Sequence, residues 1–250
     1  MSLWLDGGFW GRWIRKVFVR EIEWTRRSVF DHILPSFPDP STDADKARDA
    51  AWEMAMSQPS DGSDDPASYA DWAEEKGLET YLGITRMRQA AANLSAAMLW
   101  HLLEQQMLFF HMRQVLKIHE EQEVREKPKT RGQLFRLDEF HQRLDASGCS
   151  MKVLPSWPKV DELRLVANAV KHGPGKSLDD LFEIRPDLLI LPKSETLNLP
   201  LRQSLAWVEK PAGGEDIYVG DADLAAYFDA VTSLWEEFSN AIEEHSARKK

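Results

Sequence analysis

The stretch RQAAANLSAAMLWHLLEQQMLFFHM, residues 88–112, decides the fold, because its apolar side chains cover the whole circumference of a helix. It belongs to a longer helical pattern over residues 78–123. A helix that is apolar on all sides is normally buried, so we expect it to be the central helix of the molecule. Its first half allows a neighbouring helix to approach closely through the small side chains of Ala90, Ala91, Ala92, Ala96 and Ala97.

Helical periodicity on both sides of this stretch predicts a bundle. Further helices are expected over residues 9–33, 44–56, 131–145, 158–171 and from residue 221 onward. Two segments break the pattern: an acidic loop at residues 57–68, and a non-helical insertion at residues 188–220 with a small β-hairpin near 204–219. The sequence therefore predicts a single all-α domain over residues 1–250, a helical bundle with a long central helix and a hairpin insertion.

The composition narrows the class of protein. The 250 residues are 43% hydrophobic and carry a net charge of −10. This acidic balance argues against a protein that coats nucleic acid nonspecifically, since such binding needs many phosphate contacts, but it leaves room for a local basic groove. The single cysteine, Cys149, excludes a disulfide framework. No run of about 18 apolar residues is present, so we expect a cytoplasmic protein with no transmembrane association.

The pattern over residues 9–33 is typical of a cationic amphipathic helix. Its basic side chains are Arg12, Arg15, Lys16, Arg20, Arg26 and Arg27, and its apolar side chains are Trp10, Trp13, Ile14, Val17 and Trp24. A solvated outer face over a packed inner face is the ordinary arrangement in a bundle. An RNA-facing surface and a helix that lies on a membrane surface are the two alternatives.

Sequence motifs for metals and phosphates are missing. None of the seven histidines follows a glutamate by three residues, and no His-Glu-x-x-His occurs. The stretch HGPGKS, residues 172–177, ends like a phosphate-binding loop, but the rest of the spacing does not fit, and a turn that ends a helix explains it. We therefore expect neither a metal nor a cofactor.

A polar stripe on the helix over residues 158–171 is the strongest functional candidate. At about 100° per residue, Arg164, Asn168, Lys171 and His172 share one face. Lys171 and His172 fall in the last turn, where the helix dipole favours the protonated imidazole, and a cationic imidazole raises the affinity for anions close by. The stripe is thus a plausible setting for phosphate chemistry.

Three polar residues of the central helix form a supporting set. Asn93, Glu104 and His111 fall close to one line along a straight helix and interrupt an apolar surface. In one interpretation they form an internal hydrogen-bond network. In the other, Glu104 or His111 faces Arg164 and His172 across the bundle and supplies the charge partner that orients them.

The sequence LRLVANAVKHG, residues 163–173, resembles the signature helix of HEPN domains, which commonly show Arg-Asn-x-x-x-His at a composite site. Asn168 and His172 match this motif, Ala167 stands at the position of the arginine, and Arg164 is the nearest arginine. The segments NLSAAMLWHLLEQQ, residues 93–106, and AYFDAVTSLWEEF, residues 226–238, resemble helices that accompany such motifs in bacterial HEPN-like proteins.

The resemblance implies a homodimeric, HEPN-like protein that acts on RNA, as a metal-independent ribonuclease of a bacterial phage-defence or toxin–antitoxin system. In that role His172 would handle protons, Arg164 or Lys171 would stabilise the phosphorane charge, and Asn168 would orient the histidine or the phosphate. Ala167 leaves a second hypothesis open. The chain is then a noncatalytic helical module with a degenerate active site, which binds a partner protein or a nucleotide.

Overall fold

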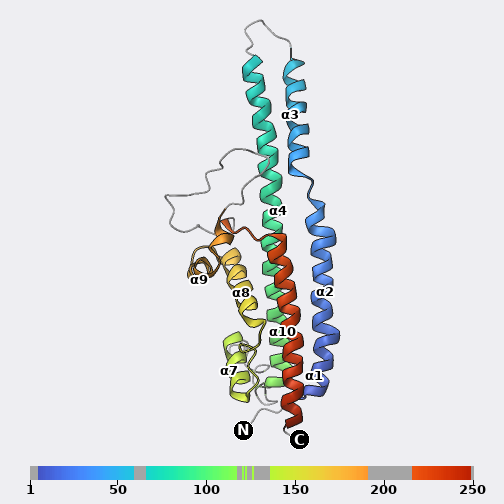
Figure 1. Ribbon diagram of the computed structural model, residues 1–250, viewed down its shortest axis with the longest axis vertical. Helices are drawn as coiled ribbons and strands as arrows, with labels where there is room; N and C mark the ends of the chain where they lie inside the picture. The colour runs from blue at the N-terminus through green and yellow to red at the C-terminus, as the bar shows by residue number, and fades with distance from the viewer. Residues whose placement is uncertain are drawn as a thin grey trace.

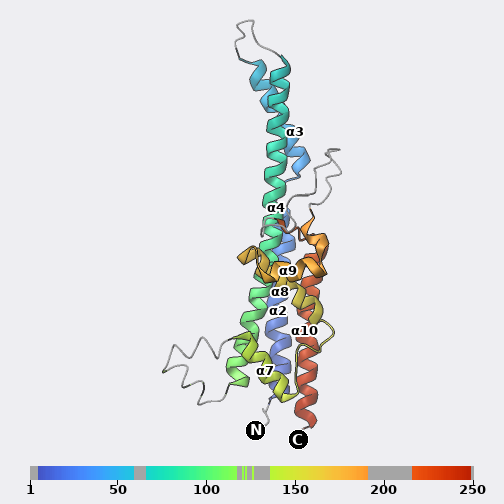
Figure 2. The same cartoon turned by 90° about the vertical axis from the view of Figure 1, so that its left-hand side faces the viewer.

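The computed structural model describes residues 5–58, 66–116, 136–190 and 216–248, together with residues 120, 122 and 126. Every element in this part of the chain is a helix, so the expected all-α fold is confirmed. The molecule is elongated (Figure 1), and the helix α4, Pro66–Phe110, runs through most of its length. Figure 2 shows the same rod from the side, with α3 and the start of α4 extending beyond the other helices.

The central helix α4 is longer at its N-terminal end than the sequence pattern predicts. It is continuous over 45 residues, and a π-helical turn, η4 (His111–Val115), follows it. Residues 66–68 were expected in a loop but belong to α4, because no proline after Pro66 interrupts the helix. The other part of the expected loop, residues 59–65, lies outside the described residues, as does most of the expected extension from 117 to 123.

The helix expected over residues 9–33 is present and contains two π-helical turns. Its segments are α1 (Gly7–Trp13), η1 (Ile14–Phe18), α2 (Val19–Arg27) and η2 (Ser28–Ile33), followed by the 3₁₀ turn η3 (Leu34–Ser36). The Asp6 side chain caps the start by accepting a hydrogen bond from the backbone N–H of Phe9. We call α1 to η2 the first helix.

The second half of α4 forms a bundle with the other helices. These are the first helix, α7 (Leu137–Ser147), α8 (Trp157–His172), α9 (Lys176–Ile184) and α10 (Asp221–Arg248). The first helix and α8 lie on opposite sides of the α4–α10 pair in Figure 1. The first helix lies very close to α10, since a Cβ atom at Gly7 would lie 2.3 Å from the carbonyl oxygen of Ile242. This contact fixes which face of the first helix turns away from the bundle.

The first half of α4 forms a projecting arm with α3 (Pro40–Met56). We use "the arm" for α3 together with residues 66–83 of α4. The helix α3 begins earlier than expected, because the Asp39 side chain caps it and Pro40 fits its first position. The two helices meet through small side chains, with Ala51 and Ala55 of α3 buried along with Ala73 and Gly77 of α4.

The expected β-hairpin is not supported. Residues 204–215 lie outside the described residues, and the described end of the segment, residues 216–219, contains no strand. Instead, Ile217 and Val219 are buried in the core without regular secondary structure. At the other end of the expected insertion, η5 (Pro186–Leu189) is a 3₁₀ turn, so residues 188 and 189 are not irregular. The Tyr218 N–H donates to the Leu188 carbonyl oxygen and joins the two ends.

The bundle core is rich in aromatic side chains contributed by several helices. Phe110 of α4 packs edge-on against Trp10, Phe140 and Phe238, with ring centroids 4.8 to 6.3 Å apart. Trp235 of α10 is fully buried beside Phe18. Large aromatic side chains contribute most of the apolar area in such a core, so these contacts stabilise the bundle far more than small side chains stabilise the arm.

We predict that Gly77→Leu opens the arm. A Cβ atom at Gly77 would lie 3.2 Å from both the Ala44 carbonyl oxygen and the Arg48 Cβ atom, so a larger side chain forces α3 away. Hydrogen exchange of the α3 amides would measure this as faster exchange. The matched control is Gly83→Leu, where a Cβ atom meets nothing within 4 Å and leucine favours the helix. Equal protection of α3 in both variants would contradict the prediction.

Candidate functional site

The polar stripe predicted on α8 is present, and its members differ in exposure. Lys171 and His172 are exposed in the last turn, and Gly173, with a φ of 66°, ends the helix. Arg164 is half-buried, and its Nε atom donates to the Asp161 carboxylate at 2.6 Å. Asn168 is also half-buried. We call these four residues, Arg164, Asn168, Lys171 and His172, the α8 stripe.

The residue that stands in place of the motif's arginine is buried. Ala167 has no exposed surface and packs in the core with Leu163 and Val166. An arginine side chain at this position would enter the apolar interior and need a buried counter-charge. Position 167 therefore faces the core, about 140° around α8 from His172, although Lys171 lies only one helical turn away.

The supporting residues on the central helix do not meet the α8 stripe. The Asn93 Nδ2 atom donates to the Ile217 carbonyl oxygen at 2.6 Å, and its Oδ1 atom accepts from the Val219 N–H at 3.3 Å. Asn93 thus attaches the segment of residues 217–219 to α4 through hydrogen bonds, as the first of the two interpretations predicts. Glu104 lies 3.5 Å from the exposed His101, and His111 is buried against the ring of Phe140. Among the described residues, no ion pair joins Glu104 or His111 to Arg164.

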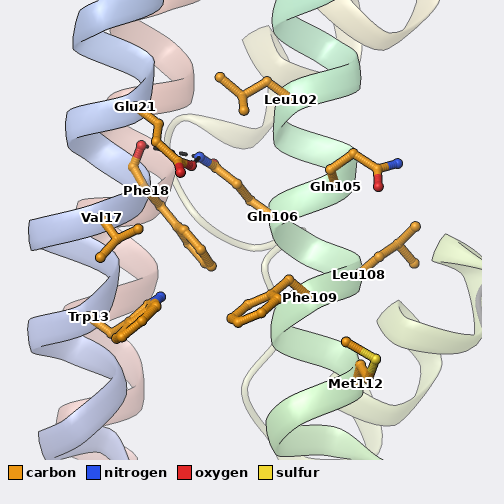
Figure 3. Close-up of a pocket in the computed structure, with 10 residues that line it drawn as sticks. All are labelled: Trp13, Val17, Phe18, Glu21, Leu102, Gln105, Gln106, Leu108, Phe109 and Met112. Atoms are coloured by element: carbon orange, nitrogen blue, oxygen red, sulfur yellow. Dashed lines mark hydrogen bonds between the residues drawn. The ribbon is translucent and has the colours of Figure 1, made fainter.

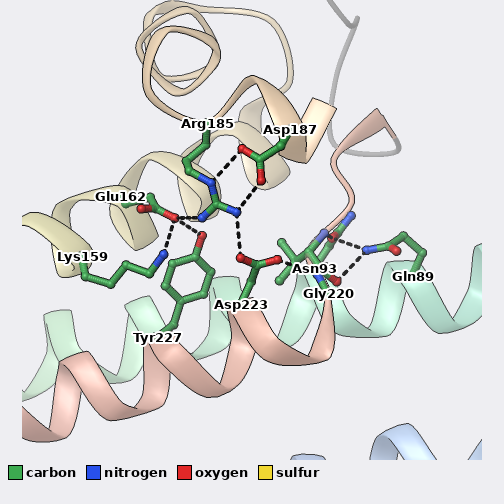
Figure 4. Close-up of polar contacts among 10 residues, drawn as sticks. Gln89, Asn93, Lys159, Glu162, Arg185, Asp187, Gly220, Asp223 and Tyr227 are labelled. Atoms are coloured by element: carbon green, nitrogen blue, oxygen red, sulfur yellow. Dashed lines mark hydrogen bonds and ion pairs between the residues drawn. The ribbon is translucent and has the colours of Figure 1, made fainter. Parts of the chain in front are cut away.

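A partly buried ionic cluster centred on Arg185 was not predicted from the sequence. In Figure 4 the Arg185 guanidinium contacts carboxylates from three elements: Glu162 of α8, Asp187 of η5 and Asp223 of α10. Both the Asp187 and the Asp223 contacts measure 2.7 Å. Glu162 also accepts from the Tyr227 hydroxyl at 2.8 Å and from Lys159 at 2.8 Å. The cluster ties α8, η5 and α10 together.

The electrostatics of this cluster suit a structural role. The hydrogen bond with Asp187 is the main reason that the pKa of Arg185 is raised, and the same contact lowers the pKa of Asp187. Burial, followed by the charge of Glu162, raises the pKa of Tyr227. Each group is thereby held in its ordinary protonation state at neutral pH: the arginine charged, the carboxylate ionised and the phenol neutral. None of these groups is poised to exchange a proton near neutral pH.

The burial of Glu162 could have been predicted from its position in the sequence. It lies four residues before Val166 and seven before Ala169, which is the spacing of one helix face. Since Val166 and Ala169 are buried, Glu162 must be buried with them. A buried carboxylate requires a cation and hydrogen-bond donors, and Arg185, Lys159 and Tyr227 supply them.

An apolar groove of about 660 Å³ lies between the first helix and α4. Figure 3 shows Trp13, Val17 and Phe18 of the first helix facing α4. A smaller hollow of about 370 Å³ continues it past Trp13 and Phe109, which line both. We call the two together the groove. Its larger part is lined by Trp13, Val17, Phe18, Glu21, Leu102, Gln105, Gln106, Leu108, Phe109 and Met112.

The walls of the groove are aromatic and partly exposed. Phe109 stacks on Trp13 with ring centroids 6.3 Å apart and 15° between the planes, and Trp13 stacks on Phe9 at 5.9 Å. Phe9 is 47% exposed, and Trp24, farther along the first helix, is 54% exposed. Stacked rings that remain exposed offer apolar area to a partner at little cost in side-chain entropy.

The buried side chain of Gln106 lies at the base of the groove and forms hydrogen bonds to two other helices. The Nε2 atom of Gln106 donates to the Glu21 carboxylate at 2.9 Å and to the Phe18 carbonyl oxygen at 3.2 Å, and its Oε1 atom accepts from the indole N–H of Trp235 at 2.7 Å. One side chain of α4 therefore connects the first helix with α10. Because these hydrogen bonds fix the separation of the helices, the groove is preformed.

One edge of the groove carries positive charge. Lys16, Arg20 and Arg27 are exposed and lie three or four residues from Trp13 or Trp24, which makes them neighbours on the helix surface. Arg20 stacks over the Trp24 ring at 5.0 Å, and Arg113 stacks over the Phe109 ring at 5.8 Å. We call Lys16, Arg20, Arg27 and Arg113 the rim cations; none forms an ion pair within the part of the chain that the structure describes.

The described residues contain neither a cluster of metal ligands nor a membrane-spanning helix. No group of three or more histidine, cysteine, aspartate and glutamate side chains could hold a metal ion there. No helix there is both long and apolar enough to cross a membrane. Comparison of the chain with protein-family models, curated proteins and solved structures finds no match. Function is therefore inferred from the groove and the α8 stripe.

We predict that Arg185→Met destabilises the protein by about 3 to 5 kcal/mol, because it leaves the Glu162 carboxylate buried without its main counter-charge. Urea unfolding would measure the loss. Adding Glu162→Gln to this variant removes the unpaired charge and should recover a large part of the stability. The control, Arg248→Met, breaks only an exposed pair with Glu244 and should change stability by less than about 1 kcal/mol. Similar losses in the two single variants would contradict the structural role.

Proposed function

We propose that this chain is a noncatalytic helical interaction module that binds an amphipathic helix in the groove. The observation that carries the proposal is the groove itself, a preformed apolar channel between two helices with stacked, partly exposed aromatic walls. A helix that lays its apolar face into such a channel is a common mode of recognition between proteins. Of the two hypotheses raised by the sequence, this one has the more extensive geometric support.

The dimensions and charge of the groove define the helix that fits. Leu102 and Met112 are ten residues apart on α4, which corresponds to about 15 Å, or nearly three helical turns. A partner helix would therefore place apolar residues at positions i, i+3 or i+4, and i+7 against Trp13, Val17 and Phe109. The rim cations favour acidic residues beside that apolar face, since opposite charges at the edge of an interface steer association and fix orientation.

A peptide-binding measurement tests this function. We expect a fluorescein-labelled helical peptide with leucines at this spacing and flanking glutamates to bind, and the same peptide with lysines for the glutamates to bind at least about tenfold more weakly. Fluorescence anisotropy would give both dissociation constants. Gln105→Trp places a large ring at the exposed side of the groove and should abolish binding, whereas Gln142→Trp on the exposed surface of α7 should not. Equal binding of the acidic peptide by both variants would contradict the proposal.

The second candidate is the HEPN-like, RNA-acting function that the α8 stripe suggests. What supports it is the exposure of Lys171 and His172 at the end of α8, with Arg164 and Asn168 half-buried on the same helix. In this proposal His172 handles protons, Arg164 or Lys171 stabilises phosphorane charge and Asn168 orients the phosphate, without a metal. Defence against phage or toxicity in a bacterium is proposed from the resemblance alone. Both candidate functions are proposed for the cytoplasm, where the thiol of Cys149 stays reduced.

Incubation of the purified protein with total RNA in EDTA tests the second candidate. Cleavage is expected for the wild type and should be lost in His172→Ala and in Arg164→Ala, because one removes the proton carrier and the other the cation. His101→Ala, which changes an exposed histidine on α4, serves as the control and should cleave normally. Circular dichroism would verify that each variant is folded. Intact RNA with the wild-type protein would remove this candidate and leave the interaction module.

A further inference from the structure

The arm exposes large apolar side chains that nothing in the described part of the chain covers. Trp52 is 39% exposed, Met54 and Met56 are 53% and 58% exposed, and Leu78 on the facing helix is 38% exposed. The arm's own interface consists mainly of alanine and glycine, so it buries little apolar area. A hairpin of two helices with so small a core gains much of its stability from whatever packs against it.

The arm and the first helix carry opposite charges. Residues 40–58 and 66–83 contain eight acidic and three basic residues, and residues 7–33 contain six basic and three acidic residues. Two of those six cations, Arg15 and Arg26, pair with Glu243 and Asp229 of α10. The first helix is left with the exposed Arg12, Lys16, Arg20 and Arg27, of which the last three are rim cations near the aromatic walls. An acidic surface with Trp52 and Met56 thus matches a basic surface with Trp13 and Phe109.

An exposed apolar stripe on α4 connects the arm with the groove. Met87 and Leu94 are 63% and 62% exposed, and Met98 is 41% exposed. At about 100° per residue these three side chains lie within about 40° of one another, and Gln105 and Met112 of the groove continue the same face. The stripe begins at the middle of the 45-residue helix, where the arm ends and the bundle begins.

These observations fit a two-fold symmetric pair of chains. A two-fold axis perpendicular to α4 beside the exposed Ala90 brings two α4 helices together antiparallel, with Met87 of each chain opposite Leu94 of the other. The same operation reverses the direction of α4, so the arm of each chain lies beside the bundle of the other. The 17 residues of α3 span about 26 Å, which is comparable to the 21 Å between Met98 and Met112.

We propose that the groove is occupied by the arm of a second copy of this chain, in an antiparallel two-fold dimer in which each chain inserts its arm into the other's groove. This inference rests on the proposed interaction function, because it names the helix that the groove binds. The interface lies on the first-helix side of α4, away from α8 (Figure 1), so both copies of the α8 stripe remain accessible.

Sedimentation equilibrium of the full chain tests the dimer. The wild type is expected to dimerise, and the charge reversals Lys16→Glu with Arg20→Glu, or Asp49→Lys with Glu53→Lys, should each raise the dissociation constant at least about tenfold. Combining all four substitutions in one chain restores opposite charges across the interface and should restore dimerisation. Lys152→Glu with Lys176→Glu changes the net charge by the same amount as Lys16→Glu with Arg20→Glu, at other exposed sites, and should have no effect.

A second variant tests whether the two α4 helices are in contact next to the proposed two-fold axis. Leu94→Arg places a charge against the apolar Met87 of the second copy on each side of the axis and should give a monomer, whereas Val153→Arg, at an 80% exposed loop position, should remain dimeric. All of these positions are exposed, and circular dichroism would verify that each variant is folded.

The outcomes separate this inference from the proposed function. A monomeric wild type, or a dimer that neither Leu94→Arg nor the charge reversals weaken, would overturn the arm-in-groove dimer. The interaction function would still stand if the acidic peptide bound and Gln105→Trp blocked it. If Gln105→Trp altered neither peptide binding nor self-association, both would fail.

Discussion

The unbroken helix α4 is the constraint on which the structure depends. Its apolar circumference has to be covered, and the first helix, α8 and α10 cover most of it in the second half, while α3 covers one side of the first half. One exposed strip remains, from Met87 through Leu94 to the groove. On α4, the exposed apolar side chains of this strip lie on a single face of the longest element and lead to the groove.

Buried polar groups fix the arrangement of helices around α4. Gln106 joins three helices through hydrogen bonds, Asn93 holds the segment of residues 217–219 before α10, and Arg185 neutralises carboxylates on three elements. Apolar contacts alone are non-directional and would tolerate small rotations of one helix on another. If a helix shifted, these polar groups would lose their hydrogen-bond or ionic partners, which costs free energy. Together they therefore specify one arrangement of the helices.

The helices were predictable from the sequence because hydrophobic periodicity is a local property. The groove was not, because it depends on the exact rotation of the first helix. A simple helical wheel assigns Trp10, Trp13, Ile14 and Val17 to one packed face, yet only Trp10 and Ile14 are buried. The π-helical turns contain more residues per turn than an α-helix and so change which side chains face the core. The Arg185 cluster escaped prediction because its members come from distant parts of the chain, although Glu162 on a buried face required such a partner.

The continuity of α4 also has a mechanical consequence. The same helix forms one wall of the groove and one half of the arm, with no proline or irregular turn between them. A helix of this kind resists bending over a few turns, so it behaves as a lever rather than as a hinge. A sideways displacement of the arm is therefore transmitted along α4 to Phe109 and Leu102, and the width of the groove depends on the position of an element tens of ångströms away.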